Sequence, residues 1–145
     1  MNNLIYPRHE SLYFHNSLAY IVEFPGEYAR VDWQAAPMFS SSLREVYEQL
    51  LQLLKEKQLR KVLSDHQMMP AIMPKDQQWL ITDWAPRAVQ ESNYRYCAII
   101  NAHDVYNRLS TTQMVHKISG STPLQIAHFQ DLQAASNWLL NSSDV

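Results

Sequence analysis

Glycine and cysteine are scarce in this chain of 145 residues, and both shortages exclude whole classes of site. The two glycines, Gly26 and Gly120, stand far apart, so neither a phosphate-binding P-loop nor a glycine-rich dinucleotide fingerprint can be written. A Gly-x-Ser-x-Gly nucleophile elbow is excluded for the same reason. The single cysteine, Cys97, rules out an internal disulfide and any zinc site built from several cysteines.

Long apolar runs and a strong net charge are also missing. Residues 1–10 contain no basic stretch followed by an apolar core, as a secretory signal would. No run approaches the roughly 20 apolar residues that span a bilayer. The formal net charge is -2, which gives no general attraction to nucleic acid or anionic lipid. We therefore expect a cytoplasmic protein with no nucleic-acid partner and no integral membrane association.

The six histidines lack the spacing of metal ligands. None stands in a His-Glu-x-x-His segment or in a paired Cys/His motif. We therefore expect no metal site, no cofactor and no catalytic residue.

The sequence does contain enough apolar material for one core. Hydrophobic residues make up 46 % and charged residues 18 %, a balance typical of folded domains and not of disordered chains. The length suits a single domain, and no repeat or low-complexity tract divides it. We assign one domain to residues 1–145, with 1–16 as a lead-in and 17–141 as the core.

Alternating apolar residues predict several strands. Residues 18–24 follow a period of two, Pro25 and Gly26 form a turn pair, and residues 28–33 return as the second strand of a hairpin. A short strand at 12–14 can precede this hairpin. Later strands are expected at 60–64, 94–101 and 124–129.

Helical spacing and capping residues predict four helical regions. An apolar stripe from Phe39 to Leu54 indicates a long helix, and Ser42 with Glu45 matches a capping box. Pro74 fits the first turn of the next helix, which Pro86 should break or kink near Trp84.

Two aspartates predict the starts of the last two helices. Asp104 and Asp131 are of the residue type that accepts hydrogen bonds from free amides at a helix start. The apolar residues expected to face inward are Val105, Leu109 and Val115 in the first of these helices, and Leu132, Ala135, Trp138 and Leu139 in the second.

The order of elements is β-β-α-β-α-β-α-β-α. It predicts an α/β fold with a mixed, mostly parallel sheet, an opening β-hairpin and about four helices. This order resembles the STAS-type fold of sulfate transporters and anti-sigma-factor antagonists. The chain is more closely similar to small bacterial single-domain proteins described as STAS/SEC14-like, many from Bacteroidetes, over about residues 18–140. Three stretches carry the resemblance: Asp65, residues 74–79 continuing to 84–88, and residues 129–131 followed by Ala135 and Trp138-Leu139.

The resemblance implies a signalling module that binds proteins and does not catalyse a reaction. Anti-sigma-factor antagonists that are regulated by phosphorylation carry an Asp-Ser pair after the third strand, and the phosphate changes docking. Here Asp65 is followed by His66 and Gln67, and no serine or threonine occurs until Thr82. The phosphoswitch serine is therefore absent from this position.

A methionine-rich loop is the candidate surface for a partner or ligand. Methionine adapts to different binding partners, although such a loop can also cover one end of the core. An exposed Trp79 would anchor binding, whereas its helical spacing favours burial. Arg87 can bind a carboxylate or phosphate or form a structural salt bridge. The candidate residues are Asp65, His66, Met68, Met69, Met73, Trp79 and Arg87.

Three functions stay open at this stage. The first is a protein-interaction module, with a homodimer as one form of it. The second is a small-molecule or lipid carrier of SEC14-like type, which requires an enclosed apolar pocket. The third is an enzyme that uses Asp65 and His66 for acid–base chemistry. The structural alternative has Asp65 capping a turn or pairing with an arginine such as Arg87, and His66 exposed.

Overall fold

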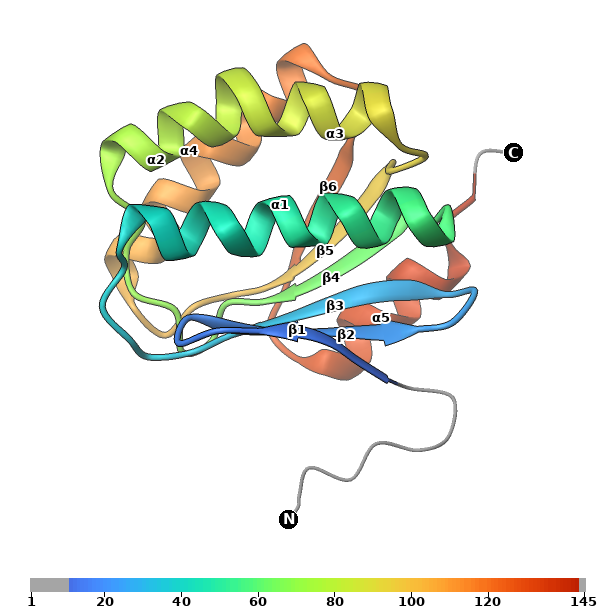
Figure 1. The fold of residues 1–145 in the computed structure, drawn as a ribbon. Coiled ribbons are helices and arrows are strands. Elements are labelled where there is room, and N and C mark those ends of the chain that lie inside the picture. Colours follow the sequence, from blue (N-terminus) through green and yellow to red (C-terminus); the bar gives the residue numbers. More distant parts are fainter. Residues whose placement is uncertain (1–10, 144–145) are drawn as a thin grey trace.

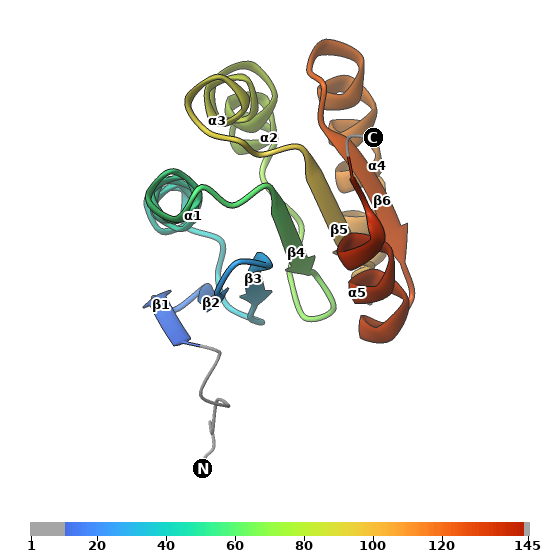
Figure 2. The same cartoon turned by 90° about the vertical axis from the view of Figure 1, so that its right-hand side faces the viewer.

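Six strands form one mixed sheet within residues 11–143, the part of the chain that the computed structural model describes (Figure 1). The strands are β1 (Ser11–His15), β2 (Ala19–Phe24), β3 (Tyr28–Trp33), β4 (Lys61–Asp65), β5 (Tyr96–Ile100) and β6 (Gln125–Phe129). They stand in the order of the chain, and Figure 2 shows this succession along the twisted sheet. The pairs β1–β2 and β2–β3 are antiparallel, and the three later pairs are parallel. The predicted mixed, mostly parallel sheet is confirmed.

The opening hairpin also confirms its predicted turn. Gly26 has a φ of +74°, a conformation that suits a residue without a Cβ. The amide of Glu27 donates to the carbonyl of Phe24 at 2.9 Å and closes the turn. The short strand expected at 12–14 is present as β1, so the sheet includes part of the segment assigned to the lead-in. The rest of that segment, residues 1–10, lies outside the described residues.

The helices cover the two faces of the sheet unequally. They are α1 (Ser40–Lys57), α2 (Pro74–Trp79), the π-helical turn η1 (Leu80–Trp84), α3 (Ala85–Glu91), α4 (Val105–Ser121) and α5 (Leu132–Asn141). The connections through α1, through α2–η1–α3 and through α4 each join neighbouring parallel strands, and right-handed crossovers put them on one face. Helix α5 follows the last strand and packs on the other face, against β4, β5 and β6 (Figure 1).

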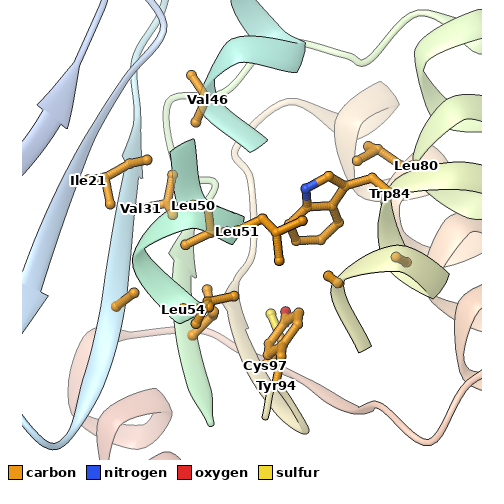
Figure 3. Close-up of a cluster of buried hydrophobic side chains, with 14 of the residues drawn as sticks. Ile21, Val31, Val46, Leu50, Leu51, Leu54, Leu80, Trp84, Tyr94 and Cys97 are labelled. Atoms are coloured by element: carbon orange, nitrogen blue, oxygen red, sulfur yellow. The ribbon is translucent and has the colours of Figure 1, made fainter. Parts of the chain in front are cut away.

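Alternation along the strands divides the apolar residues into two cores. In β5, Cys97 and Ile99 belong to the larger core under α1, α2–α3 and α4, whereas Tyr96, Ala98 and Ile100 belong to the smaller core under α5. Every residue of this strand is buried, as expected for a strand covered on both faces. Figure 3 shows the larger core, in which leucines of α1 lie between the side chains of the sheet and those of η1 and α3.

The long helical segment 74–91 continues through its internal proline, Pro86. Pro74 stands in the first turn of α2, as predicted. The kink expected near Trp84 takes the form of the π-helical turn η1, which directly precedes α3 and Pro86. A local change in helix winding is one way in which a helix accommodates the hydrogen bond that proline cannot donate.

The predicted start of α1 is wrong. The helix begins at Ser40, with Phe39 at the N-cap position and no side chain capping the amides. Ser42 and Glu45 therefore lie inside the helix and form no capping box. Phe39, predicted as part of the buried stripe, is exposed.

The inner faces of the last two helices also differ from prediction. Asp104 and Asp131 cap their helices as expected, accepting hydrogen bonds from the amides of Tyr106 and Asn107 and of Ala134. However, Val105, Leu109 and Leu132 are exposed. The residues of α4 that are buried are Asn107, Thr111, Met114 and Ile118. Hydrophobic periodicity misplaces this face because two of its four members are polar and are satisfied by hydrogen bonds.

Candidate functional site

The loop 66–73 leaves β4 at the carboxyl end of the parallel strands, the edge where open α/β sheets place their binding sites. Several hydrogen bonds hold its backbone. The amide of Met69 donates to the carbonyl of His66 at 2.9 Å, and that of His103 donates to Gln67 at 3.1 Å. The Asn107 side chain donates to the carbonyl of Pro70 at 2.8 Å. The loop is thus fixed against the start of α4.

The methionines of this loop divide between the core and the surface. Met69 is fully buried and packs in the larger core with Ile72. Met68 is 56 % exposed, and Met73, at the N-cap position of α2, is 53 % exposed. The interpretation that the loop covers one end of the core applies to Met69. Met69 covers the core and is not accessible to a partner, whereas Met68 and Met73 are.

Exposed apolar side chains gather at this end of the molecule. Phe39, at the N-cap position of α1, and Val105, Tyr106 and Leu109, in the first two turns of α4, are exposed as well, and Figure 2 shows α1 and α4 on either side of α2. Tyr106, 70 % exposed, is the most open of them. We call this group the apolar end; its members are Phe39, Met68, Met73, Val105, Tyr106 and Leu109. The other exposed large hydrophobic residues in the described part of the chain are Leu12, Leu132 and Leu140.

A buried carboxylate joins the starts of α1 and α2. Asp76 is fully buried. It accepts a hydrogen bond from Ser40 Oγ at 2.7 Å and one from Arg44 Nε at 3.1 Å. The Arg44 guanidinium also lies 4.9 Å from the centre of the Trp79 ring. Trp79 is half-buried against the larger core, so its predicted burial is partial.

Sequence reasoning missed this network. An acidic residue in a first helical turn is a recognisable signal, and Asp76 carries it. Its partners Ser40 and Arg44 stand more than 30 positions away, so no local spacing identifies them.

The side chains of Asp65 and His66 lie on opposite faces of the sheet, because successive side chains alternate along β4 and the residue after it. Asp65 Oδ1 accepts a hydrogen bond from the amide of Gln67 at 3.0 Å, which confirms the predicted turn cap. Its other oxygen lies 3.9 Å from Arg30, not near Arg87. His66 is buried, so the expectation that it is exposed is wrong. Its amide donates to the carbonyl of Ile100 at 3.0 Å, which prolongs the strand pairing and keeps the imidazole on the side of Ser64.

The His66 imidazole takes part in a buried polar chain. Its Nε2 lies 2.9 Å from Ser64 Oγ, which also accepts a hydrogen bond from Trp33 Nε1 at 3.1 Å. Burial lowers the pKa of His66 to about 4, an effect that the Asn107 side chain opposes and His128 reinforces. The ring is therefore neutral at pH 7. Asp65 makes no hydrogen bond to it among the described contacts, and the two residues do not form an acid–base pair.

Arg87 forms a structural ion pair. Its two terminal nitrogens donate to the Glu48 carboxylate at 2.7 and 2.6 Å, and its Nε donates to Asp83 at 3.3 Å. The guanidinium therefore links α3 to α1. This is the salt-bridge alternative, and the groups with which Arg87 would bind a ligand are already engaged.

A cavity of about 70 Å³ lies inside the larger core. Its aromatic walls are Trp33, Tyr47, Trp84 and Tyr94. Ser64, His66 and Thr111 contribute polar groups. Pockets that hold drug-sized molecules are commonly ~300–1,000 Å³. A lipid or a large cofactor would therefore need a different arrangement of the surrounding helices.

Three further observations concern metal binding, membrane-spanning helices and similarity to known proteins. Among residues 11–143 no cluster of three or more histidine, cysteine, aspartate or glutamate side chains is placed to hold a metal ion. In the same part of the chain no helix is both long and apolar enough to cross a membrane. A scan against models of known protein families, a search of curated proteins and a search of solved structures each found no match. What the structure defines is the class of the protein, an α/β domain.

Proposed function

We propose that this protein is a non-catalytic interaction module of STAS type, which docks transiently on another protein through the apolar end. The observation that carries the proposal is the gathering of six exposed apolar side chains at the carboxyl edge of the parallel strands. The order of strands and helices and the three resembling stretches of sequence support the STAS assignment. Signalling is the role that this assignment implies.

The composition of the apolar end suits a protein interface. Methionine and aromatic residues are enriched in such interfaces, and Met68, Met73, Phe39 and Tyr106 are of these types. Flexible methionine side chains adapt to a partner. The backbone beneath them is held by Asp76 and by Asn107, so little backbone order has to be gained on binding.

The area of the apolar end favours a transient partner over a permanent homodimer. Half-exposed side chains of this size leave on the order of 100 Å² each open, or on the order of 600 Å² for the six. A standard interface buries about 800 Å² on each partner, and obligate homodimers bury considerably more. The apolar end therefore matches the centre of one standard interface.

Docking through this end requires no phosphoswitch. Helix α2 begins at Pro74, with Met73 before it. The loop 66–73 contains neither serine nor threonine. We propose that binding does not depend on phosphorylation of a serine or threonine in this loop.

Two observations favour protein docking over the carrier function and over the enzyme function. The carrier of SEC14-like type needs a pocket several times larger than the cavity of about 70 Å³. The enzyme needs Asp65 and His66 in mutual reach, and their side chains have separate partners on opposite faces of β4.

Site-specific photocrosslinking in the native cells tests the proposal. A photoreactive amino acid is placed at Met73 or Tyr106 and, as a matched control, at Leu140, which is 48 % exposed on α5. We expect one recurrent protein adduct from both positions of the apolar end and none of that mass from position 140. With the identified partner purified, Met73→Glu should weaken binding at least tenfold, while Leu140→Glu should leave it unchanged.

Three results would contradict the proposal. The same adducts from all three positions would indicate nonspecific contact, and absence of any adduct from the apolar end would indicate that it has no partner. An adduct of twice the chain mass would replace the heteromeric partner with a second copy of this chain.

A further inference from the structure

The cavity in the larger core has walls suited to a small apolar molecule. Its lining is mainly aliphatic and aromatic, with Leu50, Met114 and Ile118 among the aliphatic members. Its volume of about 70 Å³ is roughly half that of an engineered cavity of ~150 Å³ that binds benzene. Since benzene has six non-hydrogen atoms, molecules of about three or four non-hydrogen atoms are the size class that suits this cavity.

In the polar wall of the cavity, the hydrogen-bond donors exceed the available acceptors by one. The indole nitrogen of Trp33 is a donor only, so Ser64 Oγ accepts its hydrogen. The Ser64 hydroxyl hydrogen then has His66 Nε2 as its acceptor. This arrangement places the imidazole proton on Nδ1, because the opposite tautomer would leave the Ser64 hydrogen without an acceptor.

The Nδ1 atom of His66 is buried and lacks a hydrogen-bond partner of good geometry among the described residues. The Asn107 side chain interacts with the ring, but it forms no hydrogen bond of good geometry with Nδ1; its oxygen accepts from Thr111 at 3.1 Å. A buried donor without an acceptor is costly and calls for an explanation, such as a bound molecule. His66 and Thr111 both line the cavity, so the imidazole ring forms part of its wall.

The π-helical turn η1 forms another part of the wall. Leu80 and Trp84 of this turn line the cavity, as does Ala85 directly after it. Turns of this kind occur frequently at functional sites.

We propose that this cavity is a binding site for a small, uncharged, mostly apolar molecule that accepts one hydrogen bond from His66 Nδ1. Short-chain ketones and aldehydes are the chemical class that fits. The inference goes beyond docking at the apolar end, since the cavity lies in the core and shares no residue with that surface.

Charged ligands do not fit the site. Burial lowers the pKa of His66 to about 4, so the imidazole carries no positive charge at pH 7. Arginine, lysine, aspartate and glutamate are absent from the cavity lining. A carboxylate, phosphate or amine would therefore be buried without a counter-charge, at a high cost in desolvation.

A pair of probes of the same shape tests the proposal. Acetone and isobutene differ by one oxygen, which only acetone offers as an acceptor. Each is titrated into the ¹⁵N-labelled full chain while the indole N–H signals are recorded. Trp33 and Trp84 line the cavity, whereas Trp79 and Trp138 do not and serve as internal controls. We expect saturable shifts at Trp33 and Trp84 only, and about tenfold tighter binding of acetone than of isobutene.

Two variants separate the hydrogen bond from the space. His66→Gln retains a group equivalent to Nε2 but removes Nδ1, so it should weaken acetone binding about tenfold and leave isobutene binding unchanged. Ala85→Leu extends a lining side chain toward the cavity and should abolish binding of both probes. The dispersion of each variant's spectrum verifies its fold, and the comparison of the two probes in the unaltered chain needs no variant.

Other outcomes would overturn the inference. Linear shifts at all four indoles would show a solvent effect only, and equal affinities for the two probes would show that His66 does not contact the ligand. A persistent nuclear Overhauser effect between water and the His66 Nδ1 proton in saturating acetone would show that the site holds water instead.

Discussion

The two faces of the sheet receive side chains from the same strands but give them different surroundings. On the face under α1, α2–α3 and α4, Ser64 and His66 are buried with the indole of Trp33. On the face of α5, Arg30 and Asp65 remain partly exposed. Helix α5 packs against β4, β5 and β6 and leaves β1 and β2 farther away (Figure 2). The first face is therefore dry, and the second keeps contact with water beside β3.

The difference shows that burial under a helix, more than residue type, decides whether a side chain stays charged and which groups it contacts. Asp65 and His66 are neighbours in the sequence, yet one pairs with a charged group and the other is neutral. Asp32 shows the intermediate case. Burial raises its pKa, and the ion pair with Arg30 at 2.7 Å opposes that shift. A charge is tolerated beside β3 because it has a partner and some water, and neither is available around Leu50.

The largest effect should come from a charge placed in the dry face. Leu50→Asp buries a carboxylate in the larger core, where Leu50 is 3 % exposed. We expect a loss of more than about 4 kcal/mol in the free energy of unfolding, enough to unfold most domains of this size. Urea denaturation followed by circular dichroism measures it. Leu140→Asp, on exposed α5, is the control and should change stability by less than about 0.5 kcal/mol.

A smaller effect should follow from the titration of His66. Its pKa is about 4 in the folded chain and near 6.5 in the unfolded chain. Between these pH values the unfolded chain binds the additional proton, so the free energy of unfolding falls as the pH drops from about 6.5 to about 4. The full difference is about 3 kcal/mol, and the stability is retained above pH 6.5.

Urea unfolding at pH 7, 5.5 and 4 measures this dependence. The variant His66→Gln has no group that titrates there, so its stability should fall less steeply with pH. Parallel curves for the two proteins would show that the imidazole is hydrated in the folded state, and the contrast between the faces would then disappear at this residue.

The smallest loss of stability should come from a substitution on the α5 face of the sheet. Asp65→Ala removes the hydrogen bond to the Gln67 amide and a 3.9 Å contact with Arg30. We expect a loss of about 1 kcal/mol, since turn caps and partly exposed ion pairs contribute amounts of this order. Thermal unfolding with Asp65→Asn as the control distinguishes the two contacts, because asparagine keeps an acceptor oxygen. A loss of more than about 3 kcal/mol in the free energy of unfolding would mean that Asp65 contributes like a fully buried and paired carboxylate, as Asp76 is.

Local pattern was sufficient for the order and type of most elements. Period-two segments became β2 and β3, Pro25 and Gly26 became their turn, and Pro74 began a helix. These features depend on residues within a few positions of one another. The mixed α/β sheet then followed from the order of strands and helices, because crossovers between parallel strands have one preferred hand.

The candidate site could be predicted only in part. The loop after β4 was recognised from its methionines, but the separation of Met69 from Met68 and Met73 was not. Val105 and Leu109 were predicted to face inward and are instead part of the apolar end. Hydrophobic spacing failed at α4 because Asn107 and Thr111 occupy its inner face, which a pattern of apolar residues cannot reveal.

The fold class, the hairpin turn and the aspartate caps of α4 and α5 could be predicted from local sequence, because each depends on neighbours along the chain. The packing of the helices on the sheet was needed to show that His66 is buried and neutral, that Asp76 joins two helices and that six apolar side chains lie at one end. The physical reason is distance along the chain. The groups that remove water from His66 or satisfy Asp76 come from other elements, and they meet only when the helices pack on the sheet.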